Sequence, residues 1–176
     1  WLKQSTEFLK RGLKDILTHD IWHFQRMLRK LEYFKNTKSN TVMKCYVVYL
    51  QLRVRKLGRK LGYSIPANVF GPGLSIAHAG TIVINDKARI GANCRIHVCV
   101  NIGASASDGS KAPVIGDNCY FAPGAKIYGD ITLGNNVAIG ANAVVNKSFP
   151  SNVTLAGLPA KVIAEKGPLN FRHESN

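Results

Sequence analysis

The sequence lacks any long apolar run. None of its 176 residues belongs to a stretch that approaches the roughly 18 consecutive apolar residues of a membrane-spanning helix. The first residues, Trp1 to Gln4, also lack the apolar core of a signal peptide. We therefore expect a cytoplasmic protein.

Acidic residues are scarce. The chain has 24 Lys and Arg against 10 Asp and Glu, a net charge of +14. Residues 1–62 carry 15 of the basic and 4 of the acidic residues, so the charge belongs to the first third. No recognition helix motif, zinc finger or RNP-type aromatic signature accompanies it, which argues against a specific nucleic-acid partner. Two interpretations stay open: an oligomerisation arm with a solvated basic face, and peripheral association with an anionic membrane at its inner face.

Cysteine is also sparse and carries no motif. Cys45, Cys94, Cys99 and Cys119 form no CxxC pair, and their spacing suggests neither a zinc site nor a disulfide framework. We expect buried free thiols. The run from His19 to His23 mimics the zinc motif H-E-x-x-H, but Asp replaces Glu and no third ligand is evident. We predict no metal site.

Residues 1–62 have the periodicity of amphipathic helices. Apolar residues recur every three or four positions in two stretches, separated by a polar segment from Asn36 to Asn40. In the second stretch they are Val47, Leu50, Val54, Leu57 and Leu61. We predict two or three helices with a break at that segment.

After Gly62 the period becomes six. Large apolar residues stand at every sixth position, with one interruption after Ile102: Ile90, Ile96, Ile102, Ile115, Phe121, Ile127, Leu133, Ile139 and Val145. Small or apolar residues follow four positions later: Cys94, Val100, Cys119, Ala125, Ile131, Val137 and Ala143. This period is typical of a triangular solenoid in which each face is one short strand and three hexads make a coil. A β-sandwich is the alternative, but its strands recur at about 8–12 residues.

The repeat resembles that of the hexapeptide-repeat acyltransferases, and within them the serine acetyltransferases. The resemblance rests on the repeats of 69–145, on the entry Gly71-Pro72-Gly73-Leu74-Ser75-Ile76-Ala77-His78, and on a closing segment at 155–163. It implies a mainly β chain, a left-handed parallel β-helix preceded by N-terminal α-helices. We divide the chain into a basic helical arm at 1–62, a catalytic β-helix at 63–150 with a loop insertion at 103–114, and a closing segment with the tail at 151–176.

The resemblance also implies an enzyme: an acetyl-CoA-dependent O-acetyltransferase, trimeric, with active sites between neighbouring subunits. Transfer to a hydroxyl needs a base of near-neutral pKa, a task suited to imidazole. His78 stands where this family places its catalytic histidine, and we predict it as the general base.

The acceptor is less closely defined. His97 lies about one coil after His78 and, with Asn101, is predicted to bind the acceptor. Lys111 and Ala112 match an Arg-His pair of the family's acceptor loop, and Lys111 is included as an acceptor-binding residue. The resemblance places carboxylates at positions before the histidine. At those positions this sequence has Tyr63, Ser64 and Ala77 instead. Serine, a sugar or surface-polysaccharide precursor, and a non-enzymatic scaffold with a decayed site all remain open.

For acetyl-CoA, the resemblance points to a groove between coils in which small residues admit the pantetheine arm. The predicted residues are Ala122, Gly124, Ala141 and Asn142 for the arm, and Lys147 and Lys161 for the phosphates.

Overall fold

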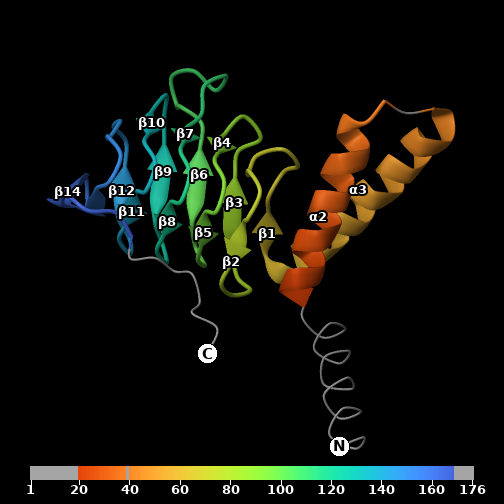
Figure 1. The fold of residues 1–176 in the computed structure, drawn as a ribbon, viewed down its shortest axis with the longest axis horizontal. Coiled ribbons are helices and arrows are strands. Elements are labelled where there is room, and N and C mark those ends of the chain that lie inside the picture. Colours follow the sequence, from red (N-terminus) through yellow and green to blue (C-terminus); the bar gives the residue numbers. More distant parts are fainter. Residues whose placement is uncertain (1–19, 39, 169–176) are drawn as a thin grey trace, which may run out of the picture. The chain divides into compact units, whose positions relative to one another are not determined.

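The computed structural model describes residues 20–38 and 40–168 (Figure 1). The chain divides into two compact units, Trp1–Leu61 and Gly62–Asn176. In the described part, the first unit is helical and the second is built from short strands.

Two helices form the described part of the first unit. Helix α2 spans Asp20–Asn36 and helix α3 spans Thr41–Leu61, which confirms the predicted break. The side chain of Asn40 caps α3 by accepting a hydrogen bond from the Met43 N–H at 3.0 Å. Neither helix is both long and apolar enough to cross a bilayer.

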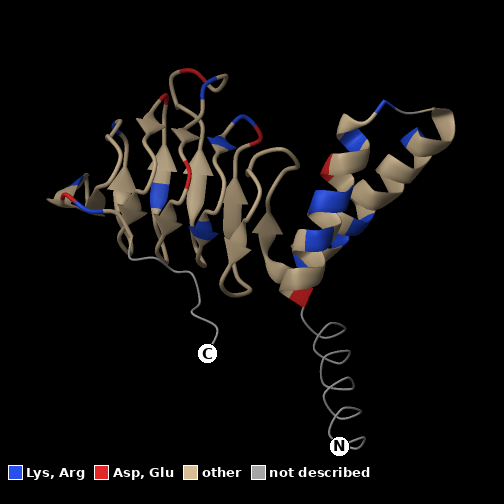
Figure 2. Cartoon of the chain, viewed as in Figure 1, with Lys and Arg blue, Asp and Glu red and all other residues tan. Residues whose placement is uncertain are grey.

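The helices pack through the apolar faces that the sequence predicts. Buried residues from both helices form this core: Phe24, Met27, Leu28, Leu31, Leu50, Val54 and Leu61. Lys and Arg positions recur along both helices (Figure 2). Lys60 and Asp20 join the two helices by an ion pair at 2.7 Å.

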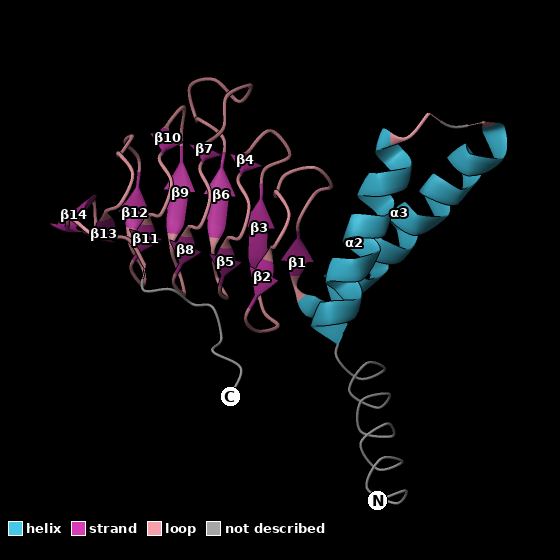
Figure 3. Cartoon of the chain, in the orientation of Figure 1, coloured by secondary structure: helices cyan, strands magenta, loops and turns pink. Residues whose placement is uncertain are grey.

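The second unit is a coil of short parallel strands in three sheets (Figure 3). The first sheet contains β1 (Tyr63–Ser64), β3 (Ile82–Ile84), β6 (Asn101–Gly103), β9 (Lys126–Tyr128) and β12 (Val144–Val145). The second contains β4 (Arg89–Ile90), β7 (Val114–Ile115) and β10 (Thr132–Leu133). The third contains β2 (Ser75–Ile76), β5 (Arg95–Ile96), β8 (Tyr120–Phe121), β11 (Ala138–Ile139), β13 (Thr154–Gly157) and β14 (Ala160–Ala164). Among the strands of the described residues, only β13 and β14 pair antiparallel, and this hairpin forms the last edge of the third sheet.

Strand register gives the length of a coil. Lys126 pairs with Val144 and Tyr120 with Ala138, in each case 18 residues further along the chain. Arg95 pairs with Tyr120, 25 residues on, because the loop of residues 104–113 adds seven residues to that coil. Ser75 pairs with Arg95, 20 residues on, so an earlier coil contains two extra residues.

The hexad residues fill the interior of the coil. All nine large apolar positions are buried, and Ile96, Ile102, Phe121, Ile139 and Val145 have no exposed surface. Side chains alternate between the faces of a strand, so each two-residue strand directs one side chain inward and one outward. The predicted solenoid is confirmed, and the β-sandwich alternative is wrong.

The cysteine prediction is only half right. Cys94 and Cys119 are buried, whereas Cys45 and Cys99 are exposed. A side-chain hydrogen bond with Cys119, together with burial, raises the pKa of the Cys94 thiol above its ordinary value. Cys45 lies on the outer side of α3 and Cys99 at a corner between strands, positions that the core pattern does not cover.

Candidate functional site at the His78 corner

One corner of the coil, where the third sheet passes into the first, carries most of the predicted site residues. Its successive turns are residues 77–81, 97–100, 122–125 and 140–143. Main-chain hydrogen bonds join each turn to the next: Cys99 N to Thr81 O at 2.6 Å, Gly124 N to Val98 O at 3.0 Å, and Asn142 N to Pro123 O at 3.0 Å. We call this stack the His78 corner.

His78 lies in the turn that holds the two extra residues, between β2 and β3. Its side chain is exposed. The next glycine permits close packing of this turn on the one below, because a Cβ at Gly80 would lie 2.9 Å from Val98 Cγ1. Gly80 also has a φ of +146°, which side chains rarely adopt. His78 is therefore exposed on a turn that is two residues longer than that of a regular coil.

Tyr63 fixes the main chain at His78. Its hydroxyl donates a hydrogen bond to the His78 carbonyl oxygen at 2.9 Å. The ring is 6% exposed, and burial raises the pKa of Tyr63 to about 12, so the phenol remains a donor near neutral pH. Sequence reasoning missed this contact because it looked for a charge at position 63, and the signal that could have found it is the tyrosine itself at that position.

His97 lies one coil below His78. Its ring centroid is 6.1 Å from that of His78, and it meets Tyr120 edge-on at 5.1 Å. Its Nε2 atom is buried and has no hydrogen-bond partner among the described residues. Burial lowers the pKa of His97, and the charges of Arg95 and His78 lower it further. The result is an imidazole that stays neutral at pH 7 and offers one unused nitrogen.

The two other predicted acceptor residues lie in different places. Asn101 directly follows the 97–100 turn of the His78 corner and is exposed on β6, where it pairs with Val83 of β3. Lys111 belongs to the loop between the first and second sheets, a different corner from that of His78. Its Nζ forms a 2.7 Å ion pair with Asp130, which raises the pKa of Lys111. Within one chain the structure does not bring Lys111 to His78.

Four of the six predicted cofactor residues lie at the His78 corner, and the two lysines lie elsewhere. Ala122, Gly124, Ala141 and Asn142 share the His78 corner, and the Asn142 side chain occupies the space where a Cβ on Gly124 would lie. Gly124 has a φ of +78°, so this tight turn favours glycine. Lys161 lies on β14 opposite Ala156 of β13. Lys147 follows β12 at another corner and is not part of this group.

The described chain offers no metal centre. Over residues 20–38 and 40–168, no group of three or more His, Cys, Asp or Glu side chains is placed to hold an ion. His19, half of the motif noted in the sequence, lies outside the described residues. Its counterpart His23 is exposed on α2.

Comparisons with known proteins agree with this geometry. The family described as "Bacterial transferase hexapeptide (six repeats)" matches residues 112–147. The chain is 41% identical to a serine acetyltransferase of Staphylococcus xylosus, over 58% of this chain and 48% of the relative. It is 39% identical to one of Staphylococcus aureus strain N315, with the same coverage. The chain spans about half the length of the curated relatives it matches.

Solved structures give the same answer for the fold. Serine acetyltransferase from Brucella abortus strain S19 superposes with a TM-score of 0.68 at 30% identity, covering 85% of this chain and 59% of that chain. The same enzyme in complex with coenzyme A gives 0.70 at 29%, covering 89% and 61%. A Neisseria gonorrhoeae serine acetyltransferase in complex with serine gives 0.66 at 28%, covering 85% and 59%. The repeat, the three-sheet coil and these structures together show that the chain folds as a left-handed parallel β-helix of hexapeptide repeats, similar to that of these serine acetyltransferases.

Proposed function

We propose that the protein is an acetyl-CoA-dependent O-acetyltransferase in which His78 is the general base. The observation that carries the proposal is an exposed imidazole, held at its main chain by Tyr63 and facing the half-buried His97. Relatives named serine acetyltransferase, and a relative's complex with coenzyme A, support acetyl-CoA as the donor.

The chemistry requires one neutral imidazole and no covalent enzyme intermediate. His78 takes the proton from the acceptor hydroxyl while the oxygen attacks the thioester carbonyl. The tetrahedral intermediate collapses, the carbon–sulfur bond breaks, and the protonated His78 returns its proton to the CoA thiolate. The products are the acetyl ester and CoA.

The groove for CoA runs along the His78 corner in this proposal. The absence of bulky side chains at Ala122, Gly124 and Ala141 would leave room for the pantetheine arm along this corner, with the exposed Ala141 and Asn142 at its edge. Lys161 and Lys147 are both exposed and would pair with the phosphates. Because Lys147 is at another corner of its own chain, its contact would come from a neighbouring subunit.

A homotrimer would complete the site. The loop at 104–113 lies at a different corner from His78 in its own chain, so it would reach an acceptor only across a subunit boundary. We propose that this loop covers the His78 corner of its neighbour.

Serine is the first candidate acceptor, from the names of the relatives. A sugar hydroxyl is the second, and a specific observation favours it. Lys111, which would bind the carboxylate of serine, is already paired with Asp130, and Ala77 and Ala112 carry no charge. An uncharged acceptor needs no such partner. A scaffold without activity is the outcome if neither acceptor class is used.

We place the enzyme in the cytoplasm. The described helices also present exposed apolar side chains beside basic ones, including Val48 and Leu52 on α3, so contact with an anionic inner membrane face is part of the proposal.

Acetyl-CoA consumption tests the function. The full chain is incubated with acetyl-CoA and either L-serine or a panel of simple sugars, and CoA thiol release is followed. Release above the rate without acceptor supports the enzyme, and the productive arm identifies the acceptor class. No release in any arm, with the protein folded and trimeric, contradicts it.

A further inference from the structure

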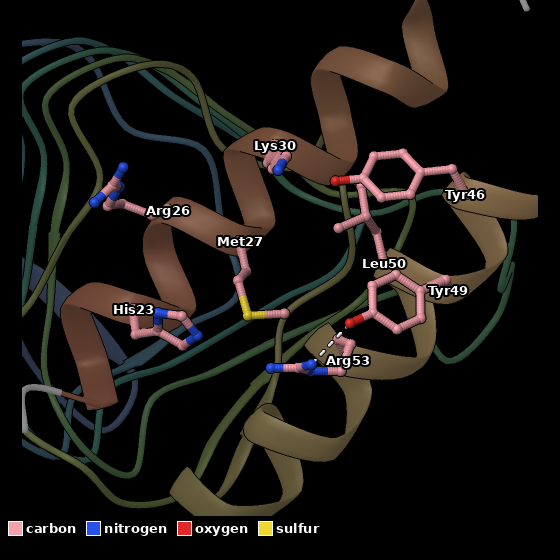
Figure 4. Close-up of a pocket in the computed structure, with 8 residues that line it drawn as sticks. All are labelled: His23, Arg26, Met27, Lys30, Tyr46, Tyr49, Leu50 and Arg53. Atoms are coloured by element: carbon pink, nitrogen blue, oxygen red, sulfur yellow. Dashed lines mark hydrogen bonds between the residues drawn. The ribbon is translucent and has the colours of Figure 1, made fainter. Parts of the chain in front are cut away.

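A second concave site lies within the helical unit, between α2 and α3. It has a volume of about 630 Å3 and is lined by His23, Arg26, Met27, Lys30, Tyr46, Tyr49, Leu50 and Arg53. This volume lies within the range typical of small-molecule sites, roughly 300–1,000 Å3. His23 and Met27 on α2 face Tyr49 and Arg53 on α3 (Figure 4).

The lining is cationic and contains no carboxylate. Arg26, Lys30 and Arg53 are basic, and none forms an ion pair within the described chain. The two acids of the described helices are used elsewhere: Asp20 pairs with Lys60, and Glu32 pairs with Arg29, each at 2.7 Å. The pocket therefore has unbalanced positive charge that an anionic ligand would neutralise.

Aromatic rings hold these cations in place. Arg53 donates to the Tyr49 hydroxyl at 2.8 Å, and Lys30 Nζ lies 5.5 Å from the centroid of the Tyr46 ring. Arg26 is positioned over the Trp22 ring, 4.4 Å from its centroid. Such contacts orient a cation without cancelling its charge, so its donors remain available to phosphate oxygens.

The pocket also has an apolar wall. Met27 and Leu50 are buried at its base, and the rings of Tyr46 and Tyr49 stack with centroids 6.1 Å apart. Tyr49 is 49% exposed, which leaves ring surface free for a flat group to pack against. Cations beside aromatic surface match a ligand that has phosphates and a planar ring.

We propose that this pocket, which we call the helix pocket, binds a soluble nucleotide-like phosphate: the phosphates on Lys30 and Arg53, and the base against Tyr49. Phosphate chemistry is shared with an anionic lipid headgroup, but the concave shape and the aromatic wall favour a soluble ligand. The inference is independent of acetyl transfer, because all eight lining residues belong to the helical unit.

Calorimetric titration of the full chain with ADP, with inorganic diphosphate and with vesicles of anionic phospholipid tests the proposal. ADP should bind saturably, more tightly than diphosphate. In Lys30→Gln/Arg53→Gln its affinity should fall by about 10-fold or more, since charge-assisted hydrogen bonds are lost. The matched control is Lys35→Gln/Arg55→Gln, which removes the same charges from the same helices outside the pocket and should change affinity by less than about threefold.

A second variant keeps the test sharp if the first one does not fold. Tyr49→Leu should weaken ADP more than diphosphate, because only ADP has a base to stack. Binding to vesicles alone, equal losses in both double variants, or unchanged ADP affinity in Tyr49→Leu would overturn the proposal. ADP binding that survives in Lys30→Gln/Arg53→Gln but is lost in Lys147→Gln/Lys161→Gln would belong to the proposed CoA groove and would also overturn it.

Discussion

The phenol of Tyr63 and the carbonyl of His78 are joined by a 2.9 Å hydrogen bond that spans 15 residues of sequence. The bond connects β1, the first strand of the coil, to the turn that carries the proposed base. It acts on the main chain rather than on the imidazole, so Tyr63 is a positioning residue in our proposal.

Removal of that hydroxyl should slow turnover. In Tyr63→Phe the ring volume is kept and the His78 carbonyl loses its donor, at a cost of about 0.5–1.5 kcal/mol for one part-buried hydrogen bond. We expect kcat to fall roughly 10-fold with little change in KM for acetyl-CoA. Because the pKa of Tyr63 is about 12, the ratio of kcat in Tyr63→Phe to kcat in the unaltered chain should be constant from pH 6 to pH 9.

Steady-state kinetics across that range checks the prediction. Tyr128→Phe, which removes an exposed hydroxyl on β9, is the matched control. Equal kcat in Tyr63→Phe and Tyr128→Phe would show that the anchor does not matter for the reaction.

His97 should make stability depend on pH. Its pKa is lowered in the folded chain, mainly by burial, so the unfolded chain takes up this proton first as pH falls. Stability is fully present above the ordinary histidine pKa of about 6.5 and declines below it, until the lower folded value is passed. Thermal unfolding at pH 7.5 and pH 5.5 should therefore show a smaller difference in Tm for His97→Gln than for the unaltered chain. An identical difference in both would mean that His97 does not contribute.

The turn beside His78 depends on the absence of a side chain at position 80. A Cβ at Gly80 would meet Val98, and φ is +146°. Gly80→Ala should lower Tm and kcat together. Val98→Ala in the same chain should recover only part of the loss, because it relieves the contact and leaves the backbone strain. Full recovery in the double variant would show that strain is unimportant, and no effect of Gly80→Ala would contradict the packing.

The ion pair with Asp130 should limit the availability of the Lys111 ammonium for an acceptor carboxylate. In Asp130→Asn the ammonium is released, and KM for L-serine should fall by up to about fivefold if the neighbouring subunit uses Lys111 to bind a carboxylate. KM for an uncharged sugar should not change. The control is Asp86→Asn. Asp86 is another exposed acid, and like Lys111 and Asp130 it lies at the corner between the first and second sheets. A KM for serine equal to that of the control would remove Lys111 from the acceptor site.

Core packing gives the coil its stability. Phe121 has no exposed surface, and Phe121→Ala should lower the free energy of unfolding by about 3–5 kcal/mol. Tyr128→Ala, from an exposed ring, should lower it by roughly 1 kcal/mol or less. Denaturant unfolding of the full chain measures both. Similar losses would contradict the inward and outward alternation of the strands.

The hexad pattern was sufficient to predict the coil because one residue type, large and apolar, is required at each inward position. The break between the helices was equally readable from the polar segment at 36–40. Details that depend on a single contact could not be predicted from the sequence. The two extra residues near His78 do not disturb the apolar pattern enough to be noticed, and the Tyr63 hydrogen bond requires knowledge of which strands stack.

The candidate site at the His78 corner could be predicted only in part, because coil length is visible in the sequence and single side-chain contacts are not. His97 could be placed near His78 from the coil length, whereas the partner of Lys111 is a carboxylate on a neighbouring turn that no periodicity marks. The helix pocket could not be predicted from the sequence because half of its residues come from α2 and half from α3. Each helix alone has only an ordinary basic face, and the cluster forms when the helices pack.

Turnover of His78→Ala tests the central claim most directly. Acetyl-CoA consumption with the productive acceptor should fall by about 100-fold or more, while the Kd for CoA stays within about twofold of the unaltered chain. Turnover at the original rate in a folded His78→Ala protein would show that the reaction, if present, is carried out elsewhere.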